Sequence, residues 1–236
     1  MSKGRLYLIP VPLGQTAVAL VLPQPVIARA QALGHFVAEN ARSARAFLKA
    51  LPATLPLQQI EIAELNKHTA TSTLPQLLAP LLAGHDVGLI SEAGCPAVAD
   101  PGATLVALAH QAAIEVVPMV GPSSILLALM ASGLTGQGFA FHGYLPSDPR
   151  ERERRLRELE NESRQAQRTQ IFIETPYRNR QMLESMLKAC APETRLCVAS
   201  DLTLASERIT TRPVSAWRRQ PLPEINRRPT VFLLQA

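Results

Sequence analysis

Three loops rich in glycine and proline are the segments of this sequence best suited to bind a small molecule. They cover residues 10–15 (PVPLGQ), 91–102 (SEAGCPAVADPG) and 120–124 (VGPSS). Glycine lets a ligand approach the backbone closely and proline fixes the loop shape, so main-chain N–H and C=O groups are left to face a ligand. Such groups suit an adenosine ribose or an amino-acid moiety. For Ser123 and Ser124, capping of the following helix is an alternative role.

The common signatures of other catalytic sites are missing from the sequence. Neither G-x-G-x-x-G nor G-x-x-x-x-G-K-[ST] occurs, which disfavours dinucleotide oxidoreductases and P-loop phosphotransferases. The G-x-S-x-G elbow and the H-E-x-x-H helix are absent as well. Cys95, Cys190 and Cys197 lack C-x-x-C spacing, so we expect buried thiols without a disulfide framework or a zinc site. No metal centre is predicted.

The elements that position these loops alternate between strands and helices. Ligands of open α/β sheets sit beyond the carboxyl ends of the strands, so loops that directly follow strands carry the most weight. Alternation of this kind predicts a parallel or mostly parallel sheet that is covered by helices on both faces. The expected strands are 5–10, 35–38, 59–62, 87–91 and 115–119, and the expected helices are 41–51, 73–83 and 103–113.

The length of 236 residues favours two lobes. The predicted fold class is α/β, with two α/β lobes and mostly parallel sheets; residues 1–119 form the first lobe and 120–236 the second. An apolar helix at 124–134 opens the second lobe, and one antiparallel strand is expected at 206–213. Its other expected strands are 139–145, 171–174, 196–200 and 230–234.

Composition and charge narrow the class of protein further. Hydrophobic residues make up 47% of the chain, yet no run approaches the ~20 apolar residues of a membrane span, and the first residues lack a signal-peptide layout. We therefore expect a cytoplasmic protein without a membrane partner. The net charge of +5 favours anionic partners such as RNA. The charged segment 150–168 is either a solvated helix with internal ion pairs or a surface that grips phosphates.

The loop motifs resemble those of the tetrapyrrole (corrin/porphyrin) methylase superfamily, in particular its branch that methylates ribosomal RNA. The family motif S-D-A-G-T-P-x-x-x-D-P-G is matched at 91–102, V-P-T-P-I-G-N at 9–15, and P-G-P-S/C at 120–124. The element Y-E-S/T-P-x-R is similar to 173–178 (IETPYR). Further matches are G-F-L-P at 143–146 and E-L-T…E at 201–207.

This resemblance implies a homodimer whose subunits hold S-adenosylmethionine in a cleft between the two lobes. The family's cofactor-binding positions carry over to two groups of residues in this chain. The first lobe and the hinge contribute Leu13, Glu92, Cys95, Ser123 and Ser124, and the second lobe contributes Thr175, Ala199 and Thr230.

Several positions depart from the pattern of the RNA-methylating branch. The A-E-D-T-R segment reads AENAR at 38–42, so Asn40 and Ala41 replace a carboxylate and a hydroxyl. Glu92 replaces an aspartate, and H-E-H-N reads NKHT at 66–69. The terminal K-G-E is replaced by the residues RRPT at 227–230. These departures leave the methyl acceptor open.

Methyl transfer from a sulfonium is an in-line displacement that depends mainly on positioning, but a ribose hydroxyl also needs a base or a cation near its oxygen. No residue is singled out as the base. His68 has an alternative role as a surface or capping residue, and Glu39 and Arg42 as a structural ion pair. The candidates, whose family counterparts lie around the mouth of the cleft, are Glu39, Asn40, Arg42, Lys67 and His68.

Three functions remain open from the sequence. The first is methylation of RNA, at a ribosomal RNA ribose 2'-hydroxyl by resemblance. The second is methylation of a tetrapyrrole or another small molecule, which would suit a basic cleft equally well. The third is a non-catalytic protein that binds S-adenosylmethionine.

Overall fold

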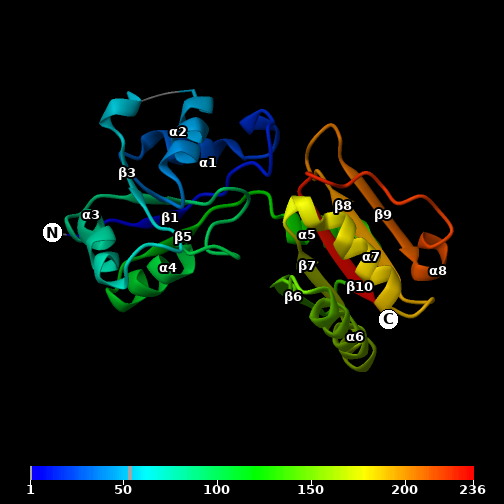
Figure 1. Ribbon diagram of the computed structural model, residues 1–236. Coiled ribbons are helices and arrows are strands. Elements are labelled where there is room, and N and C mark those ends of the chain that lie inside the picture. The colour runs from blue at the N-terminus through cyan, green and yellow to red at the C-terminus, as the bar shows by residue number, and fades with distance from the viewer. Residues whose placement is uncertain (1, 53–54) are drawn as a thin grey trace. The chain divides into compact units, whose positions relative to one another are not determined.

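The computed structural model describes residues 2–52 and 55–236, and the chain divides into two compact units between Ser123 and Ser124. Each unit contains a five-stranded sheet with helices packed on both of its faces (Figure 1). The predicted fold class of two α/β lobes is confirmed. The boundary predicted between residues 119 and 120 lies in the loop just before the observed division.

The sheet of the first unit is entirely parallel, with strand order β3-β2-β4-β1-β5. The four residues of β4, Val87–Ile90, are all buried, as a central parallel strand requires. All five predicted strands occur. The others are β1 (Leu6–Leu8), β2 (His35–Ala38), β3 (Glu61–Glu64) and β5 (Val116–Pro118).

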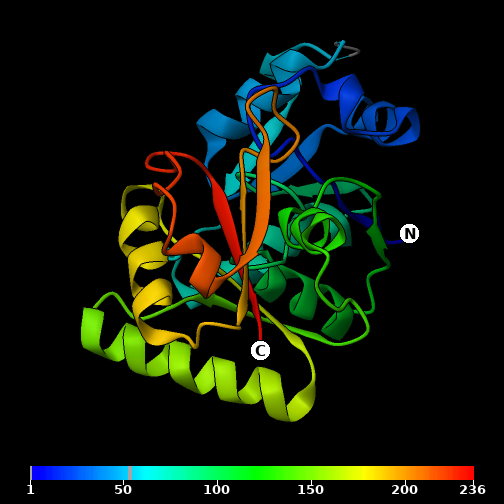
Figure 2. The ribbon, with the colours of Figure 1, turned by 90° about the vertical axis from the view of Figure 1, so that its right-hand side faces the viewer.

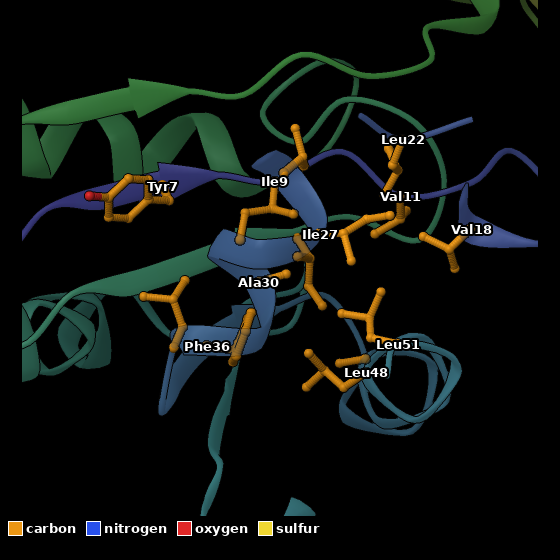
Figure 3. Packing of buried hydrophobic residues seen from close by; sticks show 14 of the residues in the cluster. Tyr7, Ile9, Val11, Val18, Leu22, Ile27, Ala30, Phe36, Leu48 and Leu51 are labelled. Atoms are coloured by element: carbon orange, nitrogen blue, oxygen red, sulfur yellow. The ribbon is translucent and has the colours of Figure 1, made fainter. Parts of the chain in front are cut away.

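Successive side chains of β1 point to opposite faces of this sheet. Tyr7 and Ile9 pack with α1 (Gln24–Ala32) and α2 (Ala41–Ala50), as Figure 3 shows from close by. Leu6 packs on the other face with η3 (Thr71–Leu78), α3 (Ala79–Leu82) and α4 (Gly102–Gln111). Two short 3-10 helices, η1 (Val18–Leu20) and η2 (Leu57–Gln59), complete the unit.

Proline explains two differences between prediction and structure in this unit. The segment predicted as a helix at 73–83 is a 3-10 helix that contains Pro75, followed by one turn of α-helix. Proline lacks an N–H donor and its ring clashes with the preceding turn, so a regular α-helix cannot run through it. Helix α1 is not among the predicted helices, because Pro23 and Pro25 resemble loop residues; they stand at the start of α1, where proline is tolerated.

The sheet of the second unit has the order β6-β7-β10-β8-β9 and is mostly antiparallel. Only β6 and β7 pair in parallel. The antiparallel strand predicted at 206–213 is present as β9, but β10 also inserts in reverse between β7 and β8, which corrects the prediction of a mostly parallel second sheet. The strands are β6 (Phe139–Tyr144), β7 (Thr169–Ile173), β8 (Arg195–Ser200), β9 (Arg208–Pro213) and β10 (Thr230–Gln235).

Helices cover both faces of this second sheet. Helix α5 (Ser124–Ser132) lies against one face, where Ser132 accepts a hydrogen bond from Thr211. The opposite face is covered by α6 (Pro149–Ala166), α7 (Asn179–Ala189) and α8 (Val214–Trp217), and Figure 2 shows α6 and α7 side by side. The short 3-10 helix η4 (Pro176–Arg178) leads into α7. Within the described part of the chain, no helix is long and apolar enough to cross a membrane.

The structure decides between the two interpretations of the charged helix α6. Arg155 contacts Glu158 at 3.2 Å and Glu162 at 2.8 Å. Arg154 lies 3.7 Å from the same Glu158, and Arg157 lies 3.6 Å from Glu153. Arg152 is buried and donates to Ser185 at 3.0 Å. The helix is therefore a solvated element that neutralises most of its own charge, and not a surface of free cations.

Candidate functional site

The loops that follow β1 and β4 meet at the carboxyl edge of the first sheet. From β1 the chain crosses to β2, whereas from β4 it crosses in the other direction to β5. The adjacent pair β1 and β4 is therefore the topological switch point, where open α/β sheets bind ligands. Two hydrogen bonds join the loops here, from Val11 N to Gly94 O at 3.0 Å and from Gly94 N to Val11 O at 3.1 Å.

The loop after β5 joins the same place. The thiol of Cys95 donates to Pro122 O at 3.4 Å, and burial raises the pKa of this thiol. Gly121 packs against Pro10 so closely that a Cβ on Gly121 would lie 2.3 Å from the Pro10 Cβ atom. All three glycine- and proline-rich loops are thus in direct contact.

Internal hydrogen bonds and unusual backbone angles fix the loop between β4 and α4. Asp100 Oδ1 accepts from Ala97 N at 2.9 Å and from Gly102 N at 2.7 Å. Burial raises the pKa of Asp100, although both N–H groups oppose that rise. Ala97 and Ala99 adopt φ values of 65° and 58°, which cost energy for a residue with a Cβ. Strain of this kind is typical of loops preshaped for a ligand.

The predicted cofactor residues of the first unit lie on these loops. Leu13 packs against Gly94, and Cys95 follows it directly. Glu92 accepts a hydrogen bond from the hydroxyl of Ser43 at 2.9 Å, and this bond ties the β4 loop to helix α2. Ser123 ends the first unit; Ser124 is the first residue of α5 and belongs to the second.

The candidates for the acceptor side follow the neighbouring strands β2 and β3. Asn40 caps α2, since its Oδ1 atom accepts from Arg42 N at 2.8 Å and from Ser43 N at 3.3 Å. Asparagine and aspartate cap helices about equally well, so the change from the family aspartate preserves the helix start and removes only a charge. The N–H of Ala41 is bound by Glu64 Oε1 at 2.8 Å.

The loop after β3 holds Lys67 and His68. Its turn is closed by Asn66, whose Oδ1 atom accepts from His68 N at 2.9 Å. No ion pair joins Glu39 to Arg42 among the residues that the structure describes, so that structural role is not realised here. The carboxyl ends of parallel strands all lie at the same end of the sheet. The five candidates for the acceptor side therefore lie at the same end of the sheet as the three loops.

Glu39 stands immediately after β2 in an acidic environment. Its pKa is raised mainly by burial, with further contributions from Glu92 and Asp100, and Lys67 opposes the rise. A raised pKa in the folded state means that the stability contribution of Glu39 is complete below its unfolded pKa and is lost as the pH rises through the folded value.

Replacing Glu39 by glutamine is therefore expected to raise the melting temperature at pH 7 and to leave it unchanged near pH 4. Thermal unfolding of both proteins across this range measures the effect. Glu193→Gln, at an exposed position of the second unit, is the matched control. A lower melting temperature of Glu39→Gln at pH 7 would contradict the expected sign.

The three predicted cofactor residues of the second unit lie at or just beyond the same end of strands β7, β8 and β10. Val231 pairs with Ala199 on one side and with Ile173 on the other, two residues before Thr175. The hydroxyl of Thr230 lies 3.2 Å from both Ser200 Oγ and Asn179 Nδ2. Sequence reasoning did not identify Asn179, which is fully buried and depends on contacts across 51 positions of the chain.

A buried carboxylate fixes the position of Thr175. Glu174 Oε1 accepts from Thr175 N at 2.6 Å and from Arg178 at 2.7 and 3.1 Å. The Glu174 side chain has no exposed surface, and its Oε2 atom has no hydrogen-bond partner among the described residues. The E-T-P-x-R motif is therefore a preorganised turn at the end of β7.

Taken unit by unit, the predicted residues form one group at the carboxyl edge of the parallel sheet and a second at the β7–β10–β8 edge. Ser43 and Arg178 belong to these groups through their bonds to Glu92 and Glu174. No cluster of metal-ligating side chains occurs in the described ranges. A parallel sheet with rigid glycine-rich loops at its switch point defines the class of α/β proteins that bind a small organic ligand there.

Within that class, the chain belongs to the Tetrapyrrole (Corrin/Porphyrin) Methylases, whose profile matches residues 5–216. The chain is 36% identical over 151 residues to the ribosomal RNA small subunit methyltransferase I of Vibrio cholerae, a match that covers 64% of this chain and 51% of that protein. It is 32% identical over 222 residues to the protein of that name from Escherichia coli, with coverage of 93% and 73%. The chain thus spans between about half and three quarters of the length of these relatives.

Solved structures of methyltransferases share the fold of this chain. The methyltransferase CobJ superposes with a TM-score of 0.64 at 18% identity, covering 98% of this chain and 94% of that one. The cobalt precorrin-4 methyltransferase CbiF gives 0.61 at 14% identity, with the same coverage. At these identities the likeness concerns the fold alone.

Proposed function

We propose that the protein transfers the methyl group of S-adenosylmethionine to RNA, at a ribose 2'-hydroxyl of small-subunit ribosomal RNA. The observation that carries the proposal is the contact of three rigid loops at the switch point of a parallel sheet, with the residues of the family motifs in those loops. The acceptor is supported by the relatives named ribosomal RNA small subunit methyltransferase I, of which the Escherichia coli protein is 32% identical to this chain over 222 residues.

The residues at the switch point fit this cofactor. A side chain at position 121 would collide with Pro10, so glycine is what lets the loops after β1 and β5 pack this closely. Glu92 and Asp100 add negative charge beside the loops, which suits a cationic sulfonium and its ammonium group. From the family motifs, we assign Leu13, Cys95 and Ser123 of the first unit and Thr175, Ala199 and Thr230 of the second unit to cofactor binding. When bound, the cofactor supplies an electrophilic methyl carbon.

The residues after β2 and β3 then bind the methyl acceptor. Methylation of a ribose hydroxyl would release its proton, and a base beside the oxygen would accept that proton. Glu39 is the candidate whose raised pKa suits a proton acceptor best, because a base is most effective when its pKa lies near the working pH. Lys67, His68 and Arg42 supply cationic or hydrogen-bonding groups for the nucleotide.

Two other functions are separate outcomes of the test. The changed positions Asn40 and Lys67 leave room for a tetrapyrrole or other small-molecule acceptor. The changes at Asn40-Ala41 and Pro229-Thr230 motivate a protein that binds the cofactor without turnover. The capping role of Asn40 argues against loss of the local structure there. We also propose a homodimer in the cytoplasm, on the strength of the family resemblance.

Isothermal titration with S-adenosylmethionine and S-adenosylhomocysteine tests the cofactor site. The wild type should bind both saturably at micromolar concentrations, and Ser123→Tyr, which fills the proposed pocket, should bind at least tenfold more weakly. Ser147→Tyr, at an exposed position outside the site, is the matched control. No binding by the wild type would refute the methyltransferase proposal.

Transfer of a tritiated methyl group identifies the acceptor. Incorporation into small-subunit ribosomal RNA, and not into porphyrin precursors, is the expected result. The opposite pattern would assign the protein to tetrapyrrole methylation, and cofactor binding without transfer to either would indicate a non-catalytic protein.

A further inference from the structure

The net positive charge of this protein comes from its second unit. Residues 1–123 contain seven basic and seven acidic residues, whereas residues 124–236 contain seventeen basic and twelve acidic ones. The entire net charge of +5 therefore belongs to the unit that is not built around the switch point.

Within the second unit, this excess is concentrated in one stretch of chain. Residues 208–228, which we call the basic segment, carry six arginines and a single acidic residue, Glu224. The segment comprises strand β9, helix α8 and the loop that leads to β10. Its arginines are Arg208, Arg212, Arg218, Arg219, Arg227 and Arg228.

The partners of these arginines hold them in place but mostly leave their charge intact. Arg212 lies over the ring of Trp217 at 5.4 Å and donates to Gln220, and Arg218 donates to main-chain carbonyls at the end of α7. Among the described residues only Arg228 has a carboxylate partner, Asp201 at 3.0 Å. The basic segment thus differs from α6, where glutamates neutralise the arginines.

Strand β9 is an edge strand that presents two of these arginines on one face. Arg208 pairs with Ser200 and Arg212 with Leu196, and residues two or four apart on a strand share a face. Their Cα atoms are about 13 Å apart at 3.3–3.4 Å per residue. Edge strands often carry charge only to prevent aggregation, but the other edge strand of this sheet, β6, contains no arginine or lysine.

We propose that the basic segment is the surface along which the RNA backbone lies, an inference that rests on RNA being the methyl acceptor. Guanidinium groups match phosphate oxygens in geometry and keep their charge at every physiological pH. The outer edge of β9 also leaves backbone N–H groups for phosphate contacts. In the sheet, Ser200 pairs with Arg208 on one side and with Thr230 on the other. The basic segment therefore starts close to Thr230, one of the predicted cofactor residues.

The test compares two triple variants with the same change in charge. Arg208→Gln/Arg219→Gln/Arg227→Gln alters exposed side chains of the basic segment that have no hydrogen-bond or ion-pair partner in the described part of the protein. Arg150→Gln/Arg154→Gln/Arg157→Gln alters exposed positions of α6. Filter binding of transcribed small-subunit ribosomal RNA, repeated over a salt series, gives affinity and the number of phosphate contacts.

The basic-segment variant should bind this RNA at least tenfold more weakly at 0.1 M salt, with a slope of log affinity against log salt that is shallower by roughly 2. The α6 variant should lose less than threefold. Both should keep the melting temperature and the affinity for S-adenosylmethionine of the wild type, which shows that folding and the cofactor site are intact.

Three outcomes would overturn the inference. Equal losses in both variants would mean that overall charge, and not this surface, attracts RNA. If the basic-segment variant bound an RNA as tightly as the wild type does, and the wild type methylated that RNA, the proposed surface would be refuted. The proposed function would stand. Tighter binding of polyglutamate than of RNA would assign the segment to an acidic protein.

Failure of the wild type to bind or methylate RNA, with cofactor binding intact, would reject RNA as the methyl acceptor.

Discussion

Replacement of Arg178 by methionine is expected to destabilise the second unit by about 3 kcal/mol. The change removes both guanidinium donors from Glu174, whose side chain is completely buried, and leaves that carboxylate without a counter-charge. Breaking a buried ion pair typically costs about 3–5 kcal/mol, and the lower end applies because 35% of the Arg178 side chain is exposed to water.

Thermal unfolding followed by circular dichroism should show a melting temperature roughly 6–12 °C below that of the wild type. Arg180→Met is the matched control, because Arg180 and Glu184 form an exposed pair on α7 that contributes about 0.5 kcal/mol or less. The double variant Glu174→Gln/Arg178→Met should recover part of the loss. Similar losses for Arg178→Met and Arg180→Met would contradict the buried-charge explanation.

Substitution of Gly121 by alanine is expected to weaken S-adenosylmethionine binding by about 10- to 100-fold. The added Cβ would lie 2.3 Å from Pro10 Cβ and 2.7 Å from Pro10 Cγ, so the loops after β1 and β5 must move apart. Overpacking at such a contact costs about 1–3 kcal/mol, and here that cost falls on the geometry that the ligand requires.

Isothermal titration measures this loss, and Gly136→Ala provides the control because no atom lies within 4 Å of a Cβ at that position. The control should bind the cofactor like the wild type. If Gly121→Ala also bound like the wild type, the contact between the two loops would have no part in shaping the site.

The first sheet and its loops were accessible to prediction because their determinants are local. Buried strands such as Val87–Ile90 are short apolar runs, and glycine and proline indicate the loop that follows this strand. Helix α7 was equally accessible, since Met182, Leu183 and Met186 have helical spacing, but it is absent from the predicted elements.

The remaining features depend on pairings between distant residues. The insertion of β10 between β7 and β8 leaves no periodic trace, because an apolar strand reads the same in either direction. The bond from Ser43 to Glu92 spans 49 positions, and no pattern around Ser43 points to its partner. The cofactor loops could therefore be predicted from the sequence, whereas the side chains that support them could be identified only from the structure.

The central place of β10 in the second sheet has a consequence for how the protein is made. In the sheet, strand β7 and the pair β8–β9 are connected by hydrogen bonds only through residues 230–235. During synthesis the first unit can fold as soon as residue 123 has left the ribosome, since domains generally fold as units from the N-terminus. The second unit must wait for its middle strand, and a nascent chain stalled before residue 230 would present two unpaired strand edges to chaperones and proteases.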